Sequence, residues 1–193
     1  MPPRPRLVII GGPNGAGKTT LCVRMTTALE LTYLGADQIA AERGLASTGQ
    51  DAIRAARLFS GKVAEALARR ESTLIESTLS GLSARRLLAS FRQAEYDITV
   101  ALVFVDSPEV CIGRIRGRVA RGGHFVPDDD VRRRFGRSLW NFWHIYRHQG
   151  HRWQLHYNGL ESLIETARGE AEMIEVLDSA AFGIFERLVE SKP

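Results

Sequence analysis

The residues best suited to chemistry form the stretch GGPNGAGKTT, at positions 11–20. It contains the pattern G-x-x-x-x-G-K-[ST] and follows the apolar run Leu7–Ile10, which predicts a strand buried in a parallel sheet. Such a loop wraps backbone N–H groups around phosphate oxygens, while its lysine supplies charge and its hydroxyl reaches Mg²⁺. We therefore predict a nucleoside-triphosphate site formed by Gly12, Pro13, Asn14, Gly15, Ala16, Gly17, Lys18, Thr19 and Thr20, with Lys18 also catalytic and Thr19 holding the metal.

Two carboxylates are expected beside this loop. The stretch LTYLGAD predicts a short second strand that ends at Asp37, and STLIEST predicts a third strand that ends at Glu76. Ligands of open α/β sheets bind at the carboxyl ends of the strands. Asp37 is therefore expected to accept the proton of a substrate hydroxyl, with a helix-capping role as the alternative. Glu76 would hold the magnesium shell through water or bind substrate hydroxyls, and Thr78 would bind the acceptor or cap the next helix.

Arginine dominates the positive charge of this chain. The net charge is +4, and 23 of the 26 basic residues are arginine, eight of them between positions 114 and 137. A local cluster of this kind favours bidentate capture of a compact phosphate over binding along a nucleic-acid backbone, so no nucleic-acid partner is expected.

A lid is predicted at about residues 112–135. Arg114, Arg118 and Arg121 share one helical face, and Gly122-Gly123 follows as a hinge. Arg118 and Arg121 are the predicted catalytic arginines. The alternative is a solvated basic face paired with the acidic run at 128–130. His124 and Arg134 are expected to bind substrate.

The remaining pattern predicts one domain, residues 1–193, with a three-layer α/β architecture. Its mostly parallel five-stranded sheet includes DITVALVFVD and WQLHYN, and LIETAR with EMIEVLD predicts a small C-terminal β-hairpin. Helices are expected at about 17–29, 50–70, 83–94, 107–121, 127–146 and 180–189. Cys22 and Cys111 match no metal or redox spacing and are expected in the core. Because no stretch has the apolar length of a membrane span, we expect a soluble, cytoplasmic protein with no membrane partner.

In order along the chain, GGPNGAGKTT, ADQIA, IESTLSG and RGGHFVP, followed by RRF and LWNF, resemble short members of the zeta toxin family of P-loop kinases. The resemblance implies a nucleotide-kinase fold, ATP and Mg²⁺ bound by Lys18 and Thr19, and transfer of the γ-phosphate to a hydroxyl of a UDP-activated amino sugar such as UDP-N-acetylglucosamine. It also implies that Asp37 is the general base and that Glu76 and Thr78 contact the acceptor. GHRW and HYNG depart from the family pattern, which affects substrate identity more than phosphoryl transfer.

Two rival functions stay open at this point. One is a kinase for another metabolite or nucleotide. The other is a nucleotide-binding regulatory protein with incidental hydrolysis, held inactive by a small antitoxin-like partner. The chain has no N-K-x-D pattern of the kind that GTPases use to read the base.

Overall fold

Within the described residues, a seven-stranded sheet positions the predicted site. The computed structural model describes residues 3–45, 49–159, 162–170 and 172–190. The strand order is β2-β3-β1-β4-β5-β6-β7; β2 to β5 are parallel with β1, β6 pairs antiparallel with β5, and β7 pairs antiparallel with β6. The predicted parallel sheet and hairpin are confirmed, and the hairpin extends the same sheet. The strands are β1 Arg6–Gly11, β2 Thr32–Leu34, β3 Thr73–Glu76, β4 Asp97–Phe104, β5 Arg152–Asn158, β6 Leu163–Glu170 and β7 Met173–Val176.

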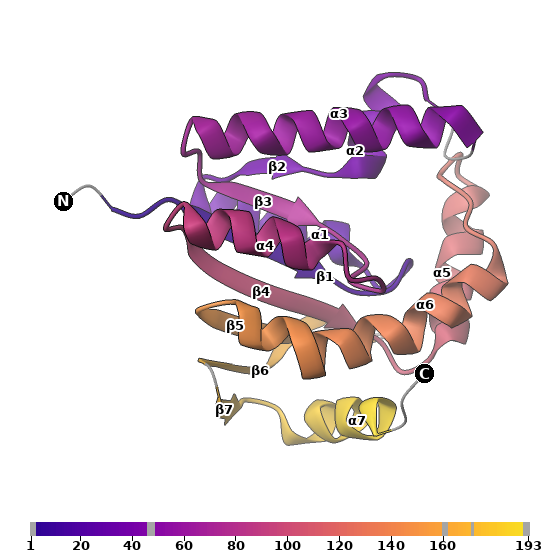
Figure 1. Ribbon diagram of the computed structural model, residues 1–193. Coiled ribbons are helices and arrows are strands. Elements are labelled where there is room, and N and C mark those ends of the chain that lie inside the picture. Colours follow the sequence, from indigo (N-terminus) through magenta and orange to yellow (C-terminus); the bar gives the residue numbers. More distant parts are fainter. Residues whose placement is uncertain (1–2, 46–48, 160–161, 171, 191–193) are drawn as a thin grey trace.

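Helices cover both faces of this sheet. In Figure 1, α4 and α6 lie in front of the sheet and α1 lies behind it, while α3 runs along the β2 edge. No helix in the described part of the chain has both the length and the apolar character needed to cross a bilayer. The helices are α1 Lys18–Leu29, α2 Ala36–Glu42, α3 Gly49–Ala68, α4 Ala84–Gln93, α5 Pro108–Val119, α6 Asp128–Asn141 and α7 Ser179–Val189.

The core on the α6 side of the sheet is aromatic. Phe142, Trp153 and Phe185 are fully buried, and their rings meet edge to face, an arrangement that suits the ring quadrupoles. The predicted long helix continues beyond α6 as one π-helical segment, Phe142–Tyr146, so the expected helical path is kept. Both cysteines are buried, as predicted.

One predicted strand boundary is wrong. β2 ends at Leu34, and Asp37 lies in the first turn of α2 rather than at the end of a strand. Gly35 is still extended and acts as the N-cap residue, and the following ADQIAAE is rich in good helix formers. Asp37 is therefore not the N-cap either, so the capping alternative is also incorrect in its detail.

Candidate active site

The phosphate loop is wedged between β5 and α5, and its glycines are required by the space available. Gly17 has φ of 100°, and a Cβ atom there would lie 2.1 Å from Nδ2 of Asn158. Gly15 has φ of 86°, and a Cβ atom would lie 2.5 Å from the carbonyl oxygen of Cys111. Asn158 Nδ2 donates to the Ala16 carbonyl at 2.7 Å and so ties the loop to β5. These contacts hold the loop in the conformation from which α1 begins at Lys18.

Glu76 lies directly beside the loop because β1 and β3 are parallel neighbours. Ile10, just before the loop, pairs with Glu76 at the end of β3, which confirms the predicted strand end. Lys18 Nζ donates to the Pro13 carbonyl at 3.1 Å and lies 3.7 Å from Glu76 Oε1. Thr19 Oγ1 donates to Glu76 Oε2 at 3.3 Å. The residues predicted to hold phosphate and metal thus contact one carboxylate.

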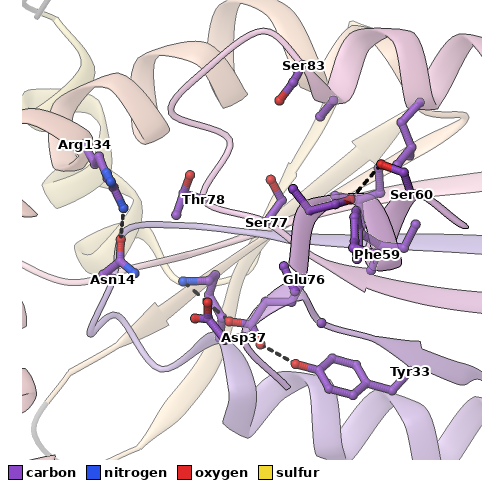
Figure 2. Close-up of a pocket in the computed structure, with 18 residues that line it drawn as sticks. Asn14, Tyr33, Asp37, Phe59, Ser60, Glu76, Ser77, Thr78, Ser83 and Arg134 are labelled. Atoms are coloured by element: carbon purple, nitrogen blue, oxygen red, sulfur yellow. Dashed lines mark hydrogen bonds and ion pairs between the residues drawn. The ribbon is translucent and has the colours of Figure 1, made fainter. Parts of the chain in front are cut away.

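Tyr33 is a site residue that the sequence reasoning did not identify. Its hydroxyl donates to Glu76 Oε2 at 2.8 Å, and Figure 2 shows it pointing toward that carboxylate. Burial, reinforced by the charge of Glu76, raises the pKa of Tyr33, so its hydroxyl stays protonated as a donor near neutral pH. A Cβ atom at Gly35 would lie 2.5 Å from the Tyr33 hydroxyl, so the glycine leaves room for this ring.

Asp37 reaches the site although it is not at a strand end. It is exposed and lies on the wall shared by two adjoining cavities. The first cavity, of about 530 Å³, lies between β3, α3 and α4, and the second, of about 750 Å³, lies over the phosphate loop. Five residues line both: Asn14, Lys18, Tyr33, Asp37 and Glu76. Two ligands bound in these cavities would therefore meet at the two carboxylates.

The predicted lid arginines line the cavity over the loop. Arg114 and Arg118 project from α5, while Arg121 lies in the turn beyond Val119, and His124 lines the same cavity. Arg118 donates to the His124 carbonyl at 2.8 Å. Gly122 has φ of 83°, as a tight turn at the predicted hinge requires.

Other arginines of this segment fit the alternative hypothesis of a basic face paired with acidic residues. Arg116 pairs with Asp128 at 2.5 Å, and Arg133 pairs with Asp130 at 2.7 Å. Arg134 combines an acidic partner with a place in the site. It donates to Asp130 at 3.0 Å and to Asn14 Oδ1 at 3.4 Å, and it lines the cavity beside α4.

Magnesium fits the donors present at the loop. Among the described residues, no group of three or more His, Cys, Asp or Glu side chains could hold a metal alone. The Thr19 hydroxyl and the Glu76 carboxylate lie together beside the glycine cradle. A set with few protein oxygens suits Mg²⁺, which keeps several waters and shares phosphate oxygens of its nucleotide.

A family model described as an AAA domain matches residues 7–138, a range that includes the phosphate loop, both carboxylates and the arginines of the predicted lid. The chain belongs to this family. The fold is accordingly an α/β P-loop kinase-like fold. A protein from Haemophilus influenzae, described as an uncharacterized protein, is 28% identical to this chain over 124 residues, which is 64% of this chain and 88% of that protein.

Solved structures resemble this AAA-domain chain over most of its length. A structure described as a putative kinase from Chloroflexus aurantiacus is 24% identical with a TM-score of 0.57, and the match covers 70% of this chain and 80% of that one. A structure of the PezAT toxin–antitoxin system of Streptococcus pneumoniae is 16% identical with a TM-score of 0.65, over 97% and 88%. The AvrRxo1-ORF1:AvrRxo1-ORF2 structure with ATP is 14% identical with a TM-score of 0.70, over 96% and 64%. At these identities the likeness supports the fold alone.

Proposed function

We propose that this protein is an ATP-dependent kinase that transfers the γ-phosphate to a hydroxyl of a small molecule. The observation that carries the proposal is the wall shared by the two cavities: Lys18 of the phosphate loop and the carboxylates of Asp37 and Glu76 line both. A kinase needs its nucleotide and its acceptor to meet at a positioned proton acceptor, and such a wall provides that meeting point.

In the proposed reaction the carboxylate of Asp37 and the cationic side chains have separate tasks. The bond from Pγ to the bridging oxygen of ADP breaks as a bond forms from Pγ to the acceptor oxygen, and the hydroxyl proton passes to Asp37. Lys18, Arg118 and Arg121 stabilise the negative charge on the phosphoryl oxygens. Thr19, with Glu76 nearby, would hold a bound Mg²⁺, which would neutralise part of the negative charge of the nucleotide phosphates.

UDP-N-acetylglucosamine is the acceptor proposed first, because the motifs resemble those of the zeta toxins. Glu76, Thr78, His124 and Arg134 are the proposed acceptor contacts; His124 lines the cavity over the loop, and the other three reach the cavity between α3 and α4. A small antitoxin-like protein is a proposed partner, supported by the similar fold of a chain from a toxin–antitoxin system.

Transfer can be tested by incubating the pure protein with ATP, Mg²⁺ and single nucleotide sugars or free sugars, followed by mass spectrometry for an added phosphate. We expect ATP consumption that depends on an acceptor. Consumption at the same rate without any acceptor would instead support the regulatory nucleotide-binding alternative and refute the kinase.

A further inference from the structure

We infer that the part of the acceptor that enters the cavity between α3 and α4 is uncharged and partly apolar, and carries no phosphate next to its reacting hydroxyl. This inference rests on the proposed kinase function and specifies its acceptor. It comes from the residues that line this cavity and do not line the nucleotide cavity.

The wall of this cavity beyond the shared residues is almost free of charge. Its apolar part comes from β1, β3, α2, α3 and α4, and its polar part consists mainly of hydroxyls. Figure 2 shows Phe59 and Ser60 on the side of the cavity opposite Asn14 and Arg134. The apolar residues are Ile9, Ala36, Ala56, Phe59, Ile75, Ala84 and Leu87, and the hydroxyl residues are Ser60, Ser77, Thr78 and Ser83.

Most of the positive charges lie at the shared wall or on its nucleotide side. Lys18 is part of the shared wall, and beyond it Arg114, Arg118 and Arg121 line the nucleotide cavity. Among the described residues, Arg134 is the one further cation that lines the cavity between α3 and α4. Arg134 is engaged with Asp130 and with Asn14 of the phosphate loop, so it lies toward the nucleotide.

A phosphate or carboxylate bound against Phe59 and Leu87 would lose water without gaining a cation, which is strongly unfavourable. A neutral ring or chain with hydroxyl or amide groups avoids that cost. Its apolar face can pack on Phe59, and its polar groups can bond to Ser77 and Ser83. The Ser77 oxygen accepts from the Leu79 amide at 3.2 Å, so its O–H group remains a donor, and Ser83 makes no capping hydrogen bond with its side chain.

Two sources could supply such a group: a free sugar-like compound, or the sugar of a nucleotide sugar whose phosphates stay at the mouth of the cavity. The same wall disfavours nucleoside monophosphates and sugar phosphates that react beside their own phosphate. The wall of this cavity therefore distinguishes neutral-ended acceptors from phosphate-bearing ones, a distinction that the phosphate loop alone does not make.

Binding and transfer should be measured separately. With Mg²⁺ and a non-hydrolysable ATP analogue bound, calorimetry would compare N-acetylglucosamine with glucose 6-phosphate, and UDP-N-acetylglucosamine with UMP. We expect at least one neutral-ended compound to bind about tenfold or more tightly than its charged counterpart, since one unpaired buried charge costs at least this much. N-acetylglucosamine binding points to a free sugar, and binding of UDP-N-acetylglucosamine alone points to a nucleotide sugar.

Two variants tie that binding to this cavity. Phe59→Ala should weaken binding of the neutral-ended compound at least about fivefold and leave binding of the ATP analogue unchanged, because it removes the apolar wall. Because Phe59 is partly buried and packs against the core, a second variant is needed that does not change core packing. Ala56 lies at an exposed position of the cavity wall, so Ala56→Trp fills the cavity without disturbing the core. Leu58→Trp, on the same helix but outside the cavity lining, is the matched control.

The inference would be overturned if, in both pairs, the charged compound bound as tightly as the neutral-ended one or more tightly. It would also be overturned if neither neutral-ended compound bound, or if Ala56→Trp left the binding of the preferred compound unchanged. Failure of the proposed kinase looks different: the neutral compound would bind, and binding would fall in the variants, but no phosphate would be transferred to it.

Discussion

Removal of the Tyr33 hydroxyl tests whether Glu76 must be held in place during the reaction. Glu76 accepts from Thr19 at 3.3 Å and lies 3.7 Å from Lys18, but both of those residues are expected to turn to the metal and the phosphates when ATP binds. The Tyr33 hydroxyl donates to Glu76 Oε2 at 2.8 Å, and since it is not expected to bind the metal or the phosphates, we expect this hydrogen bond to persist when ATP binds. We therefore expect Tyr33 to be a positioning residue that acts through Glu76.

The size of the effect follows from the bond that is lost. A hydrogen bond to a charged group contributes about 1.5–3 kcal/mol, so Tyr33→Phe should lower kcat about 10- to 100-fold if the full contribution is needed in the transition state. KM for ATP should change little, because Lys18 and the loop amides are untouched. Tyr157→Phe is the matched control, since that hydroxyl donates to Asp106 and Tyr157 lines neither cavity.

A double-mutant cycle with Glu76→Gln, measured by acceptor-dependent turnover, decides the mechanism. If Tyr33 acts through the Glu76 carboxylate, Tyr33→Phe should cost less than about threefold in the Glu76→Gln background. An equal loss in both backgrounds would show that Tyr33 acts independently of Glu76. A lowered melting temperature that accounts for the whole loss of activity would reduce Tyr33 to a structural role.

Four further predictions concern single residues. Lys18→Ala should abolish transfer while the melting temperature stays near that of the parent; near-normal phosphorylation of any acceptor would refute the phosphate-loop assignment. Arg118→Ala or Arg121→Ala should lower kcat more than it raises KM for ATP in steady-state kinetics, and a change in KM alone would make these arginines ground-state binders. Asp37→Asn should bind Mg²⁺·ATP in calorimetry like the parent but lose about 100-fold or more in kcat, the scale of a general base, whereas full turnover would exclude Asp37 as the base. Burial lowers the pKa of His156 to about 4, so the folded protein favours the neutral imidazole. The free energy of unfolding should therefore be highest above about pH 6.5 and should fall by up to about 3 kcal/mol as the pH drops toward 4, because only the unfolded state binds the proton readily in this range. Urea unfolding at both ends of the range should show a smaller difference in His156→Gln.

Local patterns predicted the parts of this site that depend on neighbouring residues in the chain. The phosphate loop, the end of β3 at Glu76 and the shared face of Arg114 and Arg118 each follow from a short motif or a helical spacing. Asp37 shows the limit of this approach. Its strand stops at Leu34 because Gly35 caps a seven-residue helix, and only the packing of that helix brings the carboxylate to the shared wall.

Tyr33 and Phe59 show why the rest was not predictable. In sequence, each looks like an ordinary apolar position of a strand or a helix, and both do pack against the core. Tyr33 meets Glu76 only because β2 pairs in parallel with β3, so that Tyr33 lies opposite Leu74 and shares a sheet face with the residue two positions beyond it. Phe59 reaches the cavity between α3 and α4 only because α3 runs past the edge of the sheet across from α4. The proposed acceptor side of this site therefore depends on long-range pairing of residues that carry no motif, and its specificity has to be argued from the fold rather than from the phosphate loop.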